Sequence, residues 1–156
     1  MDYAYTTTNP HAKVMGISIP VSTKHSMEVC RAICGKSVTE AKKFLEDVAD
    51  IKKAVPYMKY HWNLGHKAGM GPGRYPVVTC KHILELVKSV EANAQHKGLR
   101  ADICITHASA HTGPSVWKPG RQGRRQAKRT HIQIVVEEAK PETKSKNKKP
   151  AQKVQQ

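Results

Sequence analysis

Cationic side chains that could bind phosphate gather in residues 103–136, a stretch without a single Asp or Glu. An arginine guanidinium can donate two parallel hydrogen bonds to phosphate oxygens. A segment this long with one sign of charge repels itself unless a polyanion supplies the opposite charge. The pattern therefore predicts a nucleic-acid contact. The cations expected to make it are Lys118, Arg121, Arg124, Arg125, Lys128 and Arg129.

A second acid-free stretch, residues 56–76, places aromatic rings beside cations. Rings of this kind stack on bases or riboses while neighbouring cations bind phosphate. An alternative for the rings alone is that they pack back on the helices. The rings are Tyr57, Tyr60, Trp62 and Tyr75, and the cations expected to bind RNA are Lys59, Lys67 and Arg74.

Thiols and imidazoles offer a different chemistry, either nucleophilic catalysis or metal binding. Cys30 and Cys34 lie one helical turn apart on an apolar stripe, which is typical of buried structural thiols. The sequence has no Cys-x-x-Cys pair, and Cys80 and His82 would face different sides of a helix. An enzyme that uses these thiols or a metal is the alternative from another class. We expect no catalytic residue, no metal and no cofactor.

Composition points the same way as the cationic stretches. The chain has 156 residues and a net charge of +15, with an isoelectric point of about 9.9. Such a balance is typical of nucleic-acid binders. No apolar stretch is long enough to insert into a membrane, and the polar start lacks the pattern of a signal peptide. We therefore expect a cytoplasmic protein with reduced thiols.

Hydrophobic periodicity predicts the elements that position these side chains. Helices are expected over about 24–34, over about 37–54 and from Pro76 to Gly98, with Ser37 and Glu40 forming a capping box and Pro76 as the first helical residue. Strands are expected at about 14–21, 102–108 and 130–137. The Pro20 position restricts the first strand to a sheet edge. Residues 1–12 are expected to be an irregular arm.

The fold class that follows is α+β, with a three-stranded antiparallel sheet packed on about three helices. Between the last two strands, Gly and Pro residues are clustered, which favours a long extended β-hairpin arm within about 103–136. Residues 108–130, folded back on themselves, could project roughly 30–40 Å at about 3.3 Å per residue. One domain is expected over 1–138, and a Lys-rich flexible tail over 139–156.

Short motifs in a fixed order carry a resemblance to a known family. They are GKSVTEA at 35–41, GPGRYP at 71–76, ANAQHKG at 92–98, the pair Gly113-Pro114, a Gly-Arg pair (Gly120-Arg121 or Gly123-Arg124) and THIQIVV at 130–136. Over roughly residues 13–138, the sequence resembles the large-subunit ribosomal protein twenty-two family, in its archaeal and eukaryotic form.

The resemblance implies a structural, non-enzymatic constituent of the large ribosomal subunit in the cytoplasm. Its partners would be large-subunit ribosomal RNA, neighbouring ribosomal proteins and, transiently, the nascent peptide, because the family's hairpin helps line the exit tunnel. A non-ribosomal architectural protein that binds nucleic acid is the alternative. The residues that the resemblance implies at the arm tip are Gly113, Pro114, Val116, Trp117, Pro119 and Gly120.

Overall fold

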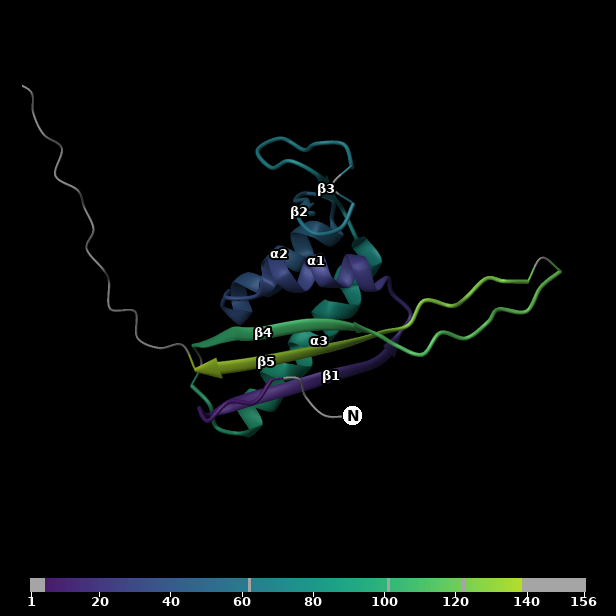
Figure 1. Ribbon diagram of the computed structural model, residues 1–156. Helices are drawn as coiled ribbons and strands as arrows, with labels where there is room; N and C mark the ends of the chain where they lie inside the picture. The colour runs from purple at the N-terminus through teal and green to yellow at the C-terminus, as the bar shows by residue number, and fades with distance from the viewer. Residues whose placement is uncertain (1–4, 62, 101, 122, 139–156) are drawn as a thin grey trace, which may run out of the picture.

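The protein is an α+β domain in which three helices cover one face of an antiparallel sheet (Figure 1). The computed structural model describes residues 5–61, 63–100, 102–121 and 123–138. The sheet has the strand order β1-β5-β4, so the first strand lies at an edge as predicted. The predicted fold class is confirmed. Its elements are β1 (His11–Ile19), α1 (Thr23–Ile33), α2 (Val38–Ala49), β2 (Val55–Pro56), β3 (Gly73–Arg74), α3 (Val77–His96), β4 (Ile103–Thr112) and β5 (Thr130–Glu138).

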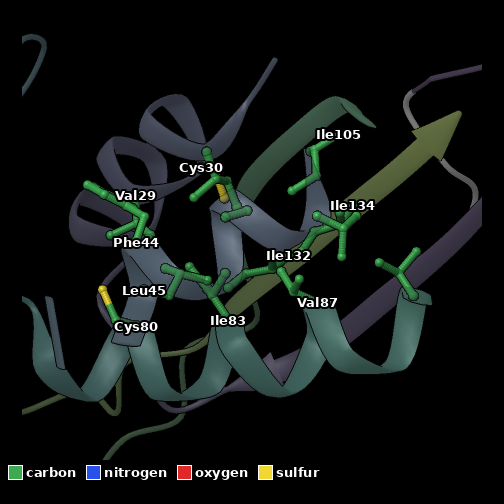
Figure 2. Packing of buried hydrophobic residues seen from close by; sticks show 14 of the residues in the cluster. Val29, Cys30, Phe44, Leu45, Cys80, Ile83, Val87, Ile105, Ile132 and Ile134 are labelled. Carbon is green, nitrogen blue, oxygen red and sulfur yellow. The ribbon is translucent and has the colours of Figure 1, made fainter. Parts of the chain in front are cut away.

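Apolar alternation along the strands directs one face of the sheet into the core (Figure 2). Ile132 and Ile134 of β5 are fully buried there, together with Leu45 of α2 and Ile83 of α3. Each such side chain stabilises the fold by about 1.5–3 kcal/mol relative to an exposed one. Gly16 of β1 lets α3 approach closely, because a Cβ there would lie 3.0 Å from a methyl carbon of Leu86. The sheet therefore gives β4 and β5, the strands that flank the cationic stretch, a rigid base.

A register shift in β4 explains why this strand is longer than predicted. The pairing with β5 is irregular between Ile105 and His107, so Ala108 and Ala110 face the core after the shift. An extra residue of this kind reverses the apolar alternation that the sequence analysis followed. The strand consequently continues to Thr112, four residues past the predicted end at 108.

Helix boundaries agree with the sequence except at two ends. Ser37 caps α2 as predicted, and its Oγ accepts a hydrogen bond from the Glu40 amide at 3.3 Å. This helix ends at Ala49 rather than near Ala54, because Ile51 adopts a left-handed φ of 63° that a helix cannot continue through. Pro76 precedes the first residue of α3 instead of being that residue, since its ψ of 63° is not helical.

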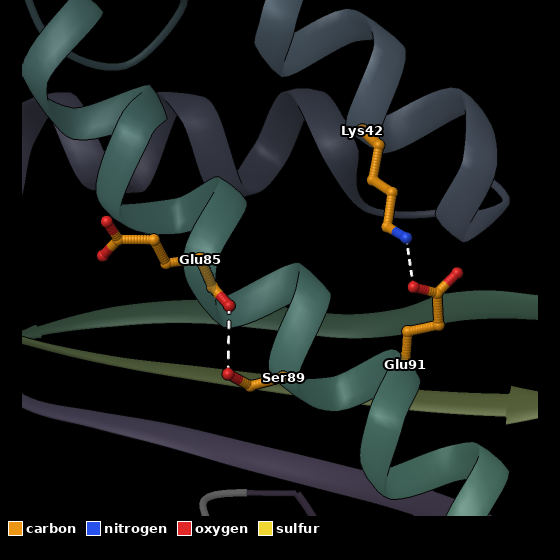
Figure 3. A network of polar contacts seen from close by, with 4 residues as sticks. All are labelled: Lys42, Glu85, Ser89 and Glu91. Carbon is orange, nitrogen blue, oxygen red and sulfur yellow. Dashed lines mark hydrogen bonds and ion pairs between the residues drawn. The ribbon is translucent and has the colours of Figure 1, made fainter.

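A polar contact joins the two longest helices on their exposed sides. Lys42 of α2 forms an ion pair with Glu91 of α3, and Ser89 donates to the Glu85 carbonyl one turn earlier at 3.0 Å (Figure 3). Both partners of the ion pair are partly exposed, so the pair contributes at most about 1 kcal/mol. The core, rather than this pair, determines how α2 lies on α3.

The segment before β1 packs against the outer face of the sheet. The Tyr5 ring stacks on His107 with the ring centroids 5.0 Å apart, and Asn9 donates to the Glu137 carboxylate at 3.1 Å. The prediction of an irregular arm over 1–12 was wrong for His11 and Ala12, which belong to β1. Residues 1–4 and the predicted tail 139–156 lie outside the described residues. Within the described ranges, no helix has the length and apolarity needed to span a membrane.

Candidate nucleic-acid interface

Residues 113–129, called the arm here, leave the end of the sheet between β4 and β5 and fold back on themselves (Figure 1). Backbone hydrogen bonds join the two legs: Gly113 to Arg129 at 2.9 Å, Ala127 to Val116 at 2.8 Å, and Lys118 to Arg125 at 2.7 Å. The ladder of the sheet ends at Thr112 and Thr130, and beyond it the described arm residues form one bridge, between Trp117 and Gln126. A long, regular β-hairpin arm therefore stays a prediction.

The turn of the arm lies later in the chain than the tip residues that the resemblance implied. The Gly123 amide donates to the Gly120 carbonyl at 3.1 Å, and Gly123 and Arg124 adopt left-handed φ values of 38° and 55°. Both Gly-Arg pairs therefore flank the turn.

Gly113 and Pro114 belong instead to the arm root, so their placement at the tip is corrected. Gly113 is buried, and a Cβ there would lie 3.1 Å from Nε2 of His131. The cross-leg bonds place Val116 and Trp117 midway along the first leg, and Pro119 and Gly120 next to the turn.

Five of the six predicted arm cations point into solvent. They are Lys118, Arg121, Arg124, Arg125 and Lys128. The sixth, Arg129, is half-buried and donates from Nη1 to the Ser18 carbonyl at 3.0 Å. This guanidinium is bound to β1, so Arg129 is less available for phosphate than the other five.

Ser18 is the point where β1 holds the arm root. Its φ of 54° is unusual for a residue other than glycine, and it lies in the irregular part of the pairing between Gly16 and Ile19. Its amide donates to Nδ1 of His131 at 3.2 Å while its carbonyl accepts from Arg129. Thr130 adds a hydrogen bond from Oγ1 to the Val21 carbonyl at 2.9 Å. These bonds fix the direction in which the arm leaves the sheet.

The second predicted basic stretch forms a loop above the helices, closed at its base by β2 and β3 (Figure 1). Its predicted RNA contacts Lys59, Lys67 and Arg74 are all exposed. The Lys67 amine lies 5.5 Å from the centre of the Tyr75 ring, within cation–π range. Tyr57 is only 2% exposed and packs in the core, which is the alternative that the sequence left open. Trp62 lies outside the described residues.

A buried carboxylate that the sequence analysis missed organises the start of this loop. Glu28 of α1 is 1% exposed and accepts hydrogen bonds from three successive backbone amides, those of Met58, Lys59 and Tyr60, at 3.2, 2.9 and 2.8 Å. Successive amides that converge in this way form an anion-binding nest, which here holds an anion of the protein itself. The only signal in the sequence was an acidic residue in the helix that packs beside the acid-free stretch 56–76.

Charges on both the arm and the loop act on His25, near the start of α1. Its pKa is lowered, first by burial and then by the charges of His61, Arg74 and Lys128. Arg74 belongs to the loop and Lys128 to the arm, so both segments act on one side chain. Cations from both predicted stretches therefore act on a residue at the start of α1.

Two of the four thiols, those of Cys30 and Cys80, are buried. Burial raises the pKa of Cys30 to about 12, with a smaller effect of Cys34, and burial alone raises the pKa of Cys80 to about 12. A thiolate is the reactive form, so these two thiols are poor nucleophiles at neutral pH. Cys34 is exposed, so its placement on the buried stripe was wrong: α1 ends at Ile33 and the chain turns away. Nowhere in the described part of the chain do three potential metal-binding side chains come together.

Fold and surface together define a class: small, strongly basic α+β proteins that present cations on an arm and on a neighbouring loop. Comparison with protein families identifies the family within that class. The family model for ribosomal protein L22p/L17e matches residues 14–137, so the chain belongs to this family. The match includes all three helices, the whole of β4, and β5 except its last residue.

Archaeal relatives support this assignment over most of their length. Each of three is named large ribosomal subunit protein uL22. The relative from Ignicoccus hospitalis is 40% identical over 81% of this chain and 87% of its own. The relative from Archaeoglobus fulgidus is 38% identical over the same shares, and that from Staphylothermus marinus is 42% identical over 81% of this chain and 88% of its own. The chain is a constituent of the large ribosomal subunit and not an enzyme.

Proposed function

We propose that the protein binds large-subunit ribosomal RNA through the positive surface formed by the arm and the loop. The observation that carries this proposal is the acid-free arm, whose Lys118, Arg121, Arg124 and Arg125 point into solvent. Residues 1–138 would then act as one RNA-binding domain, to which neighbouring ribosomal proteins dock. The rival class, an architectural protein outside the ribosome, is disfavoured by the family assignment.

Electrostatics explain why this surface suits a folded RNA. Each cation that neutralises a phosphate releases a condensed counterion, and this release favours binding. Double-stranded RNA has a major groove too narrow for side chains, so proteins read its shape, its phosphates and its unpaired loops. A narrow arm can pass between RNA helices and contact phosphates on both sides, because its cations lie on both legs and at the turn.

The arm is also proposed to line the tunnel through which the nascent peptide leaves the ribosome. This finer role rests on the resemblance described above. Val116 and Trp117 support it, because their apolar side chains are 59% and 60% exposed between the cations of the arm. Exposed apolar side chains would contact a moving peptide only transiently, whereas the neighbouring cations would bind the RNA.

Charge reversal tests the RNA-binding role of the arm. The triple variant Arg121→Glu, Arg124→Glu, Arg125→Glu should lower affinity for large-subunit rRNA by about 100-fold or more at moderate salt, because three phosphate contacts become repulsive. Filter binding with transcribed rRNA measures the affinity. The matched control reverses three exposed helix lysines, Lys43, Lys81 and Lys88, and so changes the net charge equally. If both variants lose the same affinity, net charge rather than the arm determines binding.

Crosslinking tests the tunnel role. A photoreactive amino acid at position 117 should crosslink to radiolabelled nascent chains in translating ribosomes. The same probe at position 43 on α2 should crosslink only to RNA or protein of the subunit. Nascent-chain crosslinks that are absent from position 117, or equally frequent at both positions, would contradict a tunnel-lining arm.

A further inference from the structure

A groove of about 410 Å³ lies between the start of α1, the loop and the arm root. Its wall includes Lys24 from α1, Tyr60 from the loop, and Gln126 and Lys128 from the arm. The described lining residues include no acid. The volume is within the range of pockets that hold small ligands, about 300–1,000 Å³. A groove of this volume suits a single extruded group.

Tyr60 provides an aromatic wall that is held in place. Its amide donates to Glu28 Oε1 at 2.8 Å, the shortest of the three bonds that this buried carboxylate accepts. The ring is half-buried and lines the groove. The amines of Lys24 and Lys59 lie 5.9 and 5.7 Å from the ring centre, near the outer limit of a cation–π contact. Both lysines are exposed, so their amines can move from their positions over the ring to a phosphate without breaking a strong bond.

Only some of the groove's cations are available to a ligand. Arg129 lines the groove but is bound to the Ser18 carbonyl. Lys24 and Lys128 are exposed on opposite walls, one on the helix and one on the arm. The groove thus combines an aromatic ring, carried by an anchored backbone, with two exposed cations.

We infer that this groove binds one unpaired nucleotide of RNA, with its base stacked on Tyr60 and its phosphate held by Lys24 and Lys128. A base inside a helix is covered on both faces, so only an extruded or single-stranded base can stack on the ring. The inference rests on the proposed RNA-binding function and adds a second mode of recognition to it. The arm cations bind backbone phosphates, whereas the groove recognises a nucleotide that has left its helix.

The test separates stacking from charge. In the full-length protein, Tyr60→Leu removes the aromatic face and keeps an apolar side chain, while Tyr60→Phe keeps the ring. Filter binding measures affinity for transcribed large-subunit rRNA and for a fully paired RNA duplex at the same salt. Tyr60→Leu should weaken rRNA binding by about 5- to 100-fold, as expected for one lost base stack, and leave duplex binding unchanged. Tyr60→Phe should bind both RNAs like the wild type.

A second measurement does not depend on how well a variant folds. Ultraviolet crosslinking of the wild-type protein to rRNA should join Tyr60 to a nucleotide that structure probing reports as unpaired. If Tyr60→Leu binds rRNA like the wild type, or if Tyr60 crosslinks only to paired nucleotides, the groove inference is wrong and the arm can still bind RNA. If the wild-type protein fails to bind rRNA at all, the proposed function fails with it.

Discussion

Single residues in this protein divide between exposed cations, which we propose bind RNA, and residues that hold those cations in place. Glu28 belongs to the second kind, although a carboxylate beside a positive surface would ordinarily weaken its attraction for RNA. Its charge is directed at three backbone amides, and only 1% of the residue is exposed. Lys59 and Tyr60 depend on it for their position. A buried acid can therefore order the backbone of an exposed basic loop.

Substituting Glu28 should loosen the loop and destabilise the protein. Glu28→Ala leaves three amides without their acceptor, so the free energy of unfolding should fall by about 1–3 kcal/mol or more. Urea unfolding measures the loss, and hydrogen exchange should accelerate at residues 58–60. Glu46→Ala, on the exposed side of α2, is the control and should change neither quantity. Equal exchange at residues 58–60 in the two variants would show that Glu28 does not hold the loop.

At the scale of elements, the arm depends on the strand that it leaves and on β1 beside it. Ser18 accepts the Arg129 guanidinium and binds His131, so the root is fixed even though the legs beyond it are largely irregular. A firm root lets an irregular arm keep a constant direction. The arm can then adapt along its length to the surface of its partner.

Two arginines of the arm should have opposite phenotypes. Arg129→Ala removes a charged hydrogen bond to Ser18 and should lower the free energy of unfolding by about 1–3 kcal/mol. Arg125→Ala should leave stability unchanged but weaken RNA binding and reduce the slope of log affinity against log salt by about 1. Urea unfolding and salt titrations of RNA binding measure the two effects. A stability loss in Arg125→Ala would mean that the second leg packs on the domain.

The helices and strands could be predicted from sequence much better than the tertiary contacts between them. Apolar spacing identified the three helices and the three strands of the larger sheet, because burial of one face requires that spacing, but it did not identify the two-residue strands β2 and β3. The arm cations were found because an acid-free run is visible in the chain itself. The roles of Glu28 and Arg129 could not be found, since each depends on a backbone partner far along the chain. The register shift in β4 was also missed, because an alternation pattern does not show an extra residue.

At the scale of the whole molecule, two half-buried imidazoles link stability to pH. The pKa of His25 is lowered by burial and then by His61, Arg74 and Lys128, and that of His107 is lowered by burial and then by His111. The unfolded chain therefore binds more protons than the folded protein just below the ordinary histidine pKa of about 6.5. Their contribution to stability is complete above that pH and is lost as the pH falls below it.

The free energy of unfolding should therefore decrease between about pH 7 and pH 5. Urea unfolding at several pH values measures the trend. The double variant His25→Gln, His107→Gln should flatten it, whereas His96→Gln, at the exposed end of α3, should not. A stability that rises on acidification over this range would mean that the folded protein, not the unfolded chain, binds the extra protons.

The strand order also determines when the protein can fold during its own synthesis. β1 is the first element to be made, yet its only partner in the described sheet is β5, the last. β5 in turn separates β1 from β4, so no two strands of the sheet can pair before the end of the domain has been made. The helices can form earlier from local contacts, but the sheet against which they pack does not exist until β5 has been made.

The basic arm is also made before β5, the strand that anchors its second leg. A partly synthesised chain therefore carries an unanchored cationic segment beside exposed apolar surface. Early capture by RNA or by a chaperone would protect both.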